Sequence, residues 1–166
     1  MRFAPAAAAL SLCLAMSASV LSAGAGAAPD PRAASLIAQG RASLAAGEPQ
    51  AAVDAFEAAL AVDPGYTPIF IELAVAAREQ GLQGKAIRYY REALERDPGN
   101  FAAIAGEGAA LVEKGAVEKA KKNLAKLQSL CGDACPETVA LQSSIARGPS
   151  ARLAADTKAD GAAVSN

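Results

Sequence analysis

The sequence predicts an all-α protein: an α-solenoid of three helix-turn-helix repeats followed by a C-terminal capping helix. Three observations indicate this fold class. Alanine, the strongest helix former, supplies 45 of the 166 residues. An Asp-Pro-Gly tripeptide recurs after 34 residues, which is typical of a repeat array. Apolar residues recur at three- and four-residue spacing, the period of an amphipathic helix.

The composition excludes several classes of function. The chain has no histidine, and its 16 basic residues nearly balance 17 acidic ones. Without an imidazole it is neither a serine or cysteine hydrolase with a histidine base nor a carrier of His-ligated zinc or haem. The balanced charge gives no strong attraction to nucleic acid or to an anionic membrane. We therefore expect no catalytic activity, no cofactor and no nucleic-acid partner.

Residues 1–28 are predicted to form an export signal peptide. Arg2 is followed by no charged residue until Asp30, and the stretch between them is mostly Ala, Leu, Ser and Val. A basic start, an apolar run and a small-residue end are typical of a secretory signal, with cleavage near Ala27 or Ala28. A retained membrane anchor is the alternative, although the glycines and alanines of the second half are weakly apolar. We expect a periplasmic or secreted protein that is not inserted in the membrane after cleavage.

Three units with a 34-residue period follow, at residues 33–66, 67–100 and 101–130. The tripeptide at 63–65 recurs at 97–99, and the same shift superposes a mid-unit glycine, small residues and a large apolar residue. The mid-unit glycines are Gly47, Gly81 and Gly115, and the large residues are Phe56, Tyr90 and Leu124. The small residues are Gly40, Ala74 and Gly108. We expect these small residues to face the alanines of the paired helix, Ala52, Ala86 and Ala120. The third unit lacks the closing proline and is the degenerate one.

Each unit is predicted to fold as two antiparallel helices. The first helices are expected at 33–46, 67–80 and 101–114, and the second helices at 49–62, 83–96 and 117–130. The mid-unit glycine permits the left-handed backbone conformation that ends the first helix. Pro64 and Pro98 end the preceding second helices. Thr67 before Pro68 is typical of an N-cap followed by a proline at the first helical position.

Residues 136–147 are predicted to form a capping helix, because Val139, Leu141 and Ile145 stand at helical spacing after a proline. The last repeat of a solenoid leaves an apolar face open, and an extra helix commonly covers it. The folded domain is therefore expected to span residues 33–147. Residues 148–166 show no sustained periodicity and are expected to be disordered.

The repeat resembles the tetratricopeptide repeat, in which a bulky residue precedes Leu-Gly or its equivalent, followed by Ala-x3-aromatic and a closing proline. The second unit matches best, with Phe70, Leu73, Ala74, Gly81, Ala86, Tyr90, Ala93 and Pro98. The first unit departs at Gln39 and Ser43, and the third departs at Glu107 and Leu127. The resemblance covers residues 33–130.

This resemblance implies a non-catalytic scaffold that holds a protein or peptide partner in a concave groove lined by the first helices. Assembly of a cell-envelope complex is a setting that the resemblance permits. The lining residues that it implies are Ala34, Ile37, Arg41, Leu44, Pro68, Ile71, Val75, Arg78, Ala105, Ala109 and Val112. The lining is largely apolar with two arginines on one flank. Packing between repeats is the alternative role of Ile37 and Ile71. A homo-oligomer is a further possibility, because three repeats can leave an open apolar edge.

Some chaperone-binding members of this family hold a peptide's C-terminal carboxylate with asparagine and lysine side chains in the groove. Arg41, Val75 and Ala109 stand at the asparagine positions in this chain. That specialised role is therefore not expected here.

Cys131 and Cys135 are the most suggestive local feature. In an oxidising compartment we expect a structural disulfide that closes a short loop. The alternative function is thiol redox chemistry or metal handling by this pair, since the N-terminus of the following helix would favour a thiolate. A redox pair more often has two intervening residues beside a βαβ pattern, and a copper site would need a histidine; neither is present.

Overall fold

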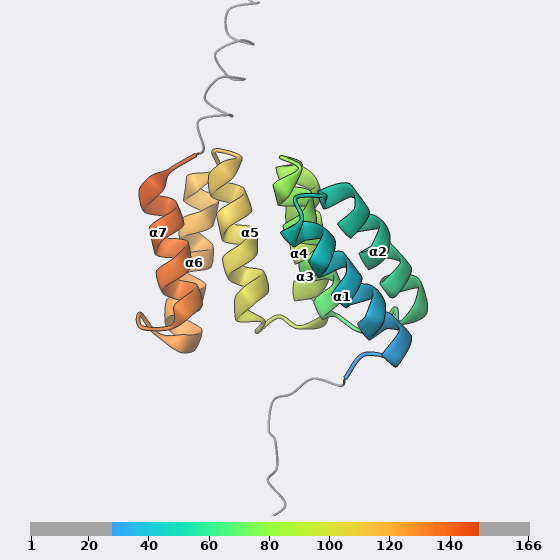
Figure 1. Ribbon diagram of the computed structural model, residues 1–166. Helices are drawn as coiled ribbons and strands as arrows, with labels where there is room; N and C mark the ends of the chain where they lie inside the picture. Colours follow the sequence, from blue (N-terminus) through green and yellow to red (C-terminus); the bar gives the residue numbers. More distant parts are fainter. Residues whose placement is uncertain (1–27, 150–166) are drawn as a thin grey trace, which may run out of the picture.

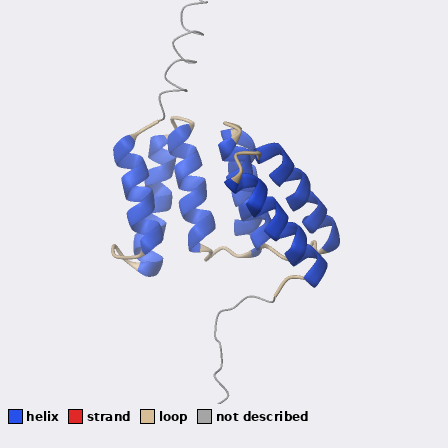
Figure 2. Ribbon diagram, viewed as in Figure 1, coloured by secondary structure: helices blue, strands red, loops and turns tan. Residues whose placement is uncertain are grey.

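The computed structural model describes residues 28–149, and this part of the chain contains seven α-helices and no strand (Figures 1 and 2). The helices are α1 (Pro31–Ala45), α2 (Pro49–Val62), α3 (Pro68–Glu79), α4 (Gln83–Arg96), α5 (Phe101–Glu113), α6 (Val117–Cys131) and α7 (Pro136–Arg147). The all-α solenoid of helical pairs is confirmed. Nearly all of the predicted signal peptide and of the predicted tail lies outside the described residues. Of the helices that the structure describes, none has the length and apolar character needed to span a bilayer.

Three of the helices, α2, α4 and α7, begin and end at the predicted residues. Helix α1 begins at Pro31, earlier than predicted, because the Asp30 carboxylate accepts a hydrogen bond from the Arg32 backbone N–H at 2.8 Å. Helices α1, α3 and α5 each end one residue earlier than predicted, since Ala46, Gln80 and Lys114 are their C-cap residues. Helix α3 also begins one residue later than predicted, at Pro68. Helix α6 extends one residue further than predicted, to Cys131.

Thr67 stands at the predicted N-cap position of α3, but it does not cap the helix through its side chain. Its backbone is already helical, with φ −50° and ψ −38°, and its side chain makes no capping hydrogen bond within the described chain. The chain instead enters α3 through a tight turn, in which the Phe70 N–H donates to the Thr67 carbonyl at 3.1 Å. Pro68 does occupy the start of the helix, as predicted.

The mid-unit glycines form the turns inside the repeats. Gly47, Gly81 and Gly115 have φ angles of 76°, 74° and 81°, in the left-handed region that favours glycine. Each N–H also donates to the carbonyl three residues earlier in the first helix, at 2.8 to 3.0 Å. The predicted turn chemistry is therefore confirmed.

Small residues allow the helices to pack closely. A Cβ atom built on Gly40 would lie 2.4 Å from the Phe56 ring, and one on Gly106 would lie 2.3 Å from the Tyr90 ring. At Gly108 the nearest atom is a methyl of Leu141 in α7, at 2.6 Å. The atoms nearest to an added Cβ at Gly40 and Gly108 thus belong to large side chains, Phe56 and Leu141.

Buried apolar clusters cross the boundaries between repeats. One joins α1, α2 and α3 around Phe56, and the next joins α3, α4, α5 and α6 around Tyr90. The third joins Ile104, Leu127 and Leu141 of α5, α6 and α7. Every repeat therefore buries its apolar residues against its neighbour, and α7 covers the last repeat as predicted.

We expect Gly40→Ala to destabilise the fold, although alanine favours a helix by about 1 kcal/mol. The added methyl would overlap the fully buried Phe56 ring, and such overpacking costs about 1–3 kcal/mol. Gly84 in α4 is the matched control, because it is exposed and a Cβ there meets only the Lys114 Nζ, at 3.7 Å. Urea unfolding followed by circular dichroism measures both variants; an equal gain of stability in the two would contradict this packing.

Candidate partner-binding face

The first helices of the repeats lie next to one another, α1 beside α3 and α3 beside α5 (Figure 1). We call the solvent side of these three helices the A-helix face. It is defined by the predicted lining residues that remain accessible: Ala34, Arg41, Leu44, Pro68, Ile71, Val75, Arg78, Ala105 and Ala109. Of these, Arg41 is exposed and the others are half-buried.

Two predicted lining residues need a correction. Ile37 is 4 % exposed and Val112 is 1 % exposed. Ile37 packs in the cluster of α1, α2 and α3, and Val112 packs in the cluster around Tyr90. Because a partner cannot reach them, they act in packing between helices. Ile71 differs from Ile37, since it is only half-buried and remains part of the face.

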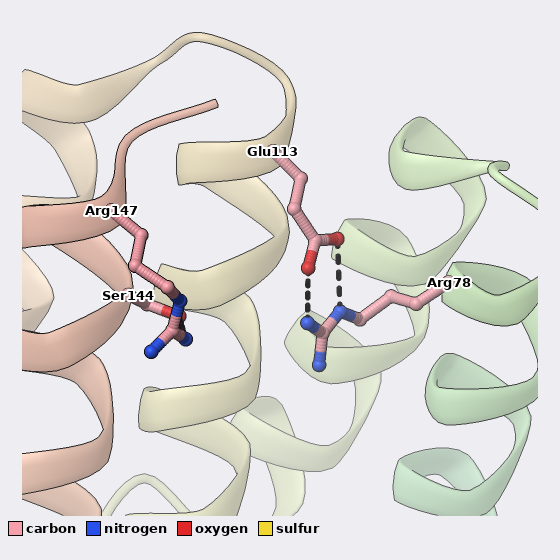
Figure 3. A network of polar contacts seen from close by, with 4 residues as sticks. All are labelled: Arg78, Glu113, Ser144 and Arg147. Atoms are coloured by element: carbon pink, nitrogen blue, oxygen red, sulfur yellow. Dashed lines mark hydrogen bonds and ion pairs between the residues drawn. The ribbon is translucent and has the colours of Figure 1, made fainter. Parts of the chain in front are cut away.

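The two predicted arginines are neutralised by carboxylates of the next first helix. The Arg41 Nε donates to Glu72 Oε1 at 2.8 Å and joins α1 to α3. The Arg78 Nε donates to Glu113 Oε2 at 3.1 Å and joins α3 to α5 (Figure 3). The hydrogen bond to the glutamate raises the pKa of each arginine above its usual range, against the lowering effect of burial. Arg41 and Arg78 therefore form two ion pairs that cross-link neighbouring first helices, and each pair carries no net charge.

The sequence reasoning missed Glu72 and Glu113. The signal that points to them is their separation from the arginines, 31 and 35 residues, which is close to the repeat length. Opposite charges one repeat apart on equivalent helices lie close together when the repeats stack.

Glu107, a departure from the family pattern, is 8 % exposed in α5. Its Oε1 accepts a hydrogen bond from the Arg91 Nε of α4 at 2.8 Å, and its Oε2 accepts one from the Asn123 Nδ2 of α6 at 3.0 Å. Burying a carboxylate is costly unless it is paired. Since both oxygen atoms have partners, Glu107 links the three helices α4, α5 and α6.

Tyr90 is the largest fully buried side chain, at 2 % exposure. Burial raises the pKa of its phenol, because the charged phenolate is disfavoured away from water, and the nearby Arg78 opposes this only in part. The ring lies against Gly106 of the following repeat. Tyr90 therefore holds the second repeat against the third.

Cys131 and Cys135 lie where α6 ends and α7 begins. Their Cα atoms are 5.7 Å apart and their sulfur atoms are within bonding distance, a separation that suits a disulfide. Gly132, with φ 86°, turns the chain between them. Within residues 28–149 no group of three or more His, Cys, Asp or Glu side chains is arranged to hold a metal ion.

The fold and its exposed face define a helical-repeat solenoid of the type built from 34-residue units. The family model described as tetratricopeptide repeat matches residues 37–101 and 71–125, which together make up more than half of the chain. The chain therefore belongs to the tetratricopeptide repeat (TPR) family. No curated protein matches the chain.

Solved structures with the same fold are TPR domains of low sequence identity. The second TPR domain of human RPAP3, in complex with the HSP70 peptide SGPTIEEVD, is 20 % identical with a TM-score of 0.61; the match covers 69 % of this chain and 94 % of that one. The Sgt2 TPR domain from Aspergillus fumigatus is 24 % identical with a TM-score of 0.64, covering 72 % and 81 %. The first TPR of Spaghetti (RPAP3), bound to the HSP90 peptide SRMEEVD, is 20 % identical with a TM-score of 0.63, covering 70 % and 95 %.

The burial of Tyr90 predicts a loss of stability in alkali. Because its folded pKa is raised, Tyr90 adds no pH dependence below about pH 10, the ordinary tyrosine pKa. Above that pH the unfolded phenol ionises while the folded one stays protonated, so the free energy of unfolding falls.

Urea unfolding between pH 8 and pH 11 measures this dependence. Tyr90→Phe should remove part of the alkaline decline, whereas Tyr89→Phe, a change at the neighbouring half-buried ring, is the control. An alkaline decline of the same size in wild type and Tyr90→Phe would show that Tyr90 does not cause it.

Proposed function

We propose that the chain is a non-catalytic scaffold that holds a peptide or a partner helix on the A-helix face. The observation that carries this proposal is an apolar strip between the two interhelical ion pairs. Val75 lies on α3 between Glu72 and Arg78, and Ala105 and Ala109 continue the strip on α5. All three apolar side chains are half-buried, so each keeps surface that a partner can cover.

The energetics favour an apolar side chain as the main contact. Each well-placed anchor contributes about 1–3 kcal/mol when a partner buries it. The glutamates already neutralise Arg41 and Arg78, so the middle of the face carries no net charge that a partner must compensate. The strip therefore suits an extended or helical segment with small or medium apolar residues.

Family membership supports the same proposal. In the two RPAP3 structures a TPR domain is seen with an HSP70 or an HSP90 peptide. We do not propose these peptides as the partners of this chain, because Arg41, Val75 and Ala109 occupy the asparagine positions of the chaperone-binding members. We transfer only the general property, that a TPR domain binds a peptide.

We further propose that the scaffold acts outside the cytosol, in the periplasm or after secretion, in assembly or maintenance of a cell-envelope complex. The signal-like pattern of residues 1–28 supports the location. The position of Cys131 and Cys135 supports it too, because a disulfide there would tie α7 to α6 and is stable only under oxidising conditions.

We expect Ala109→Trp to weaken partner binding by at least tenfold. The bulky side chain would cover the strip on α5, where Ala109 is half-buried. The probe is a library of random twelve-residue peptides displayed on phage and selected on the full chain. The affinity of the selected peptides is then measured by fluorescence anisotropy.

The matched control is Ala125→Trp, the same change at an exposed position of the second helix α6. This variant should bind the selected peptides like the wild type. Failure to select any peptide, or equal binding by both tryptophan variants, would contradict a partner site on the A-helix face.

Export and the cysteine pair are tested together. The full chain expressed in a bacterium should reach the envelope or the medium, begin near residue 28, and resist alkylation at both cysteines until it is reduced. A variant without residues 1–28 should stay in the cytosol with both thiols alkylated. Cys131→Ser with Cys135→Ser should keep peptide binding; loss of binding together with a thiol activity of the wild type would favour the redox alternative.

A further inference from the structure

We propose that α7 is also a part of the partner-binding face, where Val139 contacts an apolar residue of the partner peptide and Arg147 binds an acidic side chain. The inference rests on the proposed function and extends it from three helices to four. It also states the chemistry of the partner, which the apolar strip alone does not.

Helix α7 continues the repeat register. Thr138 and Leu141 stand 34 residues after Ile104 and Glu107 of α5, and all four side chains are buried. Leu141 contacts the position of Gly108, so α7 packs directly against α5. Helix α7 therefore packs against both α5 and α6 and follows the third repeat at the end of the solenoid (Figure 1).

One side of α7 is exposed and in register with the A-helix face. Val139, Ser143 and Arg147 follow one another at four-residue spacing, so they share one side of the helix, and all three are exposed. Val139 and Ser143 stand 34 residues after Ala105 and Ala109, the two lining residues of α5. At 49 % exposure, Val139 is among the most exposed large apolar side chains of the described chain.

Arg147 supplies the charge. Figure 3 shows its side chain and that of Ser144 on one flank of α5, with Arg78 on the other. Glu113 neutralises Arg78, whereas Arg147 donates only to the Ser144 Oγ, at 3.2 Å, and forms no ion pair within residues 28–149. A guanidinium binds a carboxylate through two parallel hydrogen bonds, which makes Arg147 the place on this face where an acidic residue is favoured.

The spacing along α7 sets the pattern of the partner. From Val139 to Arg147 a helix rises by about 12 Å. An extended peptide covers that distance in about four residues. The fitting partner segment therefore carries a small or medium apolar residue about four positions from an aspartate or glutamate.

The test uses the phage-selected peptides, which are fused to the coat protein through their C-termini, so that only side chains supply carboxylates. Selected peptides should be enriched in Asp or Glu, and Arg147→Gln should weaken their binding about tenfold. Val139→Ala should weaken it about fivefold. Circular dichroism and thermal unfolding show that each variant keeps the wild-type fold.

Two matched controls lie on the second helices. Arg88→Gln removes an exposed arginine of α4, and Leu130→Ala shortens a side chain of α6 that is 48 % exposed. Both should bind within about twofold of wild type. If Ala109→Trp abolishes binding but Arg147→Gln and Val139→Ala do not change it, this inference is overturned and the proposed function stands. If no peptide is selected, or if Ala109→Trp leaves binding unchanged, the proposed function fails and this inference fails with it.

Discussion

The close approach of helices at glycine positions is the constraint on which the rest of the structure depends. At Gly40, Gly106 and Gly108 a single added carbon would overlap a large buried side chain of a facing helix. These contacts let Phe56 and Tyr90 bury their rings between the helices. A helical pair by itself cannot bury such residues, so the stability of each unit belongs to the interfaces that it shares with its neighbours.

The same stacking produces the face on which the proposed function depends. Because successive units repeat the same packing, their first helices lie next to one another, and residues about 34 positions apart in the sequence become neighbours. The ion pairs of Arg41 and Arg78 are a direct result, since each joins one first helix to the next. Half-buried apolar residues between these pairs keep a surface that the protein's own core does not use. The protein thus has a packed interior, and its A-helix face carries an uncharged apolar strip. The cationic side chain of Arg147 on α7 lies at the end of this face.

The sequence predicted the features that depend on local chemistry. The Asp-Pro-Gly tripeptides and the mid-unit glycines located the turns, so the boundaries of α2 and α4 were predicted to the residue; those of α7 followed from Pro136 and the helical spacing of its apolar residues. Thr67 stands at the predicted N-cap position, but its side chain makes no capping hydrogen bond within residues 28–149, and its backbone is already helical in the turn before α3. A residue type gives a preference, and the neighbouring turn decides whether that preference is used.

Features that depend on the relative position of helices escaped prediction. Ile37 and Ile71 occupy equivalent positions, yet the first is buried and the second half-buried, since Ile71 has a different pair of neighbouring helices. The carboxylate partners of Arg41 and Arg78 stand at offsets of 31 and 35 residues, so the repeat length locates them only approximately and a search at an offset of 34 misses both. The 34-residue offset between α5 and α7 was present in the sequence. It was missed because no second helix follows α7 within residues 28–149, so this segment does not form a complete repeat.

The most direct test of a partner site on the first helices is solution NMR of the full chain with a selected peptide. Amide chemical shifts report each helix separately, so they locate the bound segment without any substitution. The account predicts that the largest changes fall on α1, α3, α5 and α7, while α2, α4 and α6 change little. Changes concentrated on the second helices would contradict it.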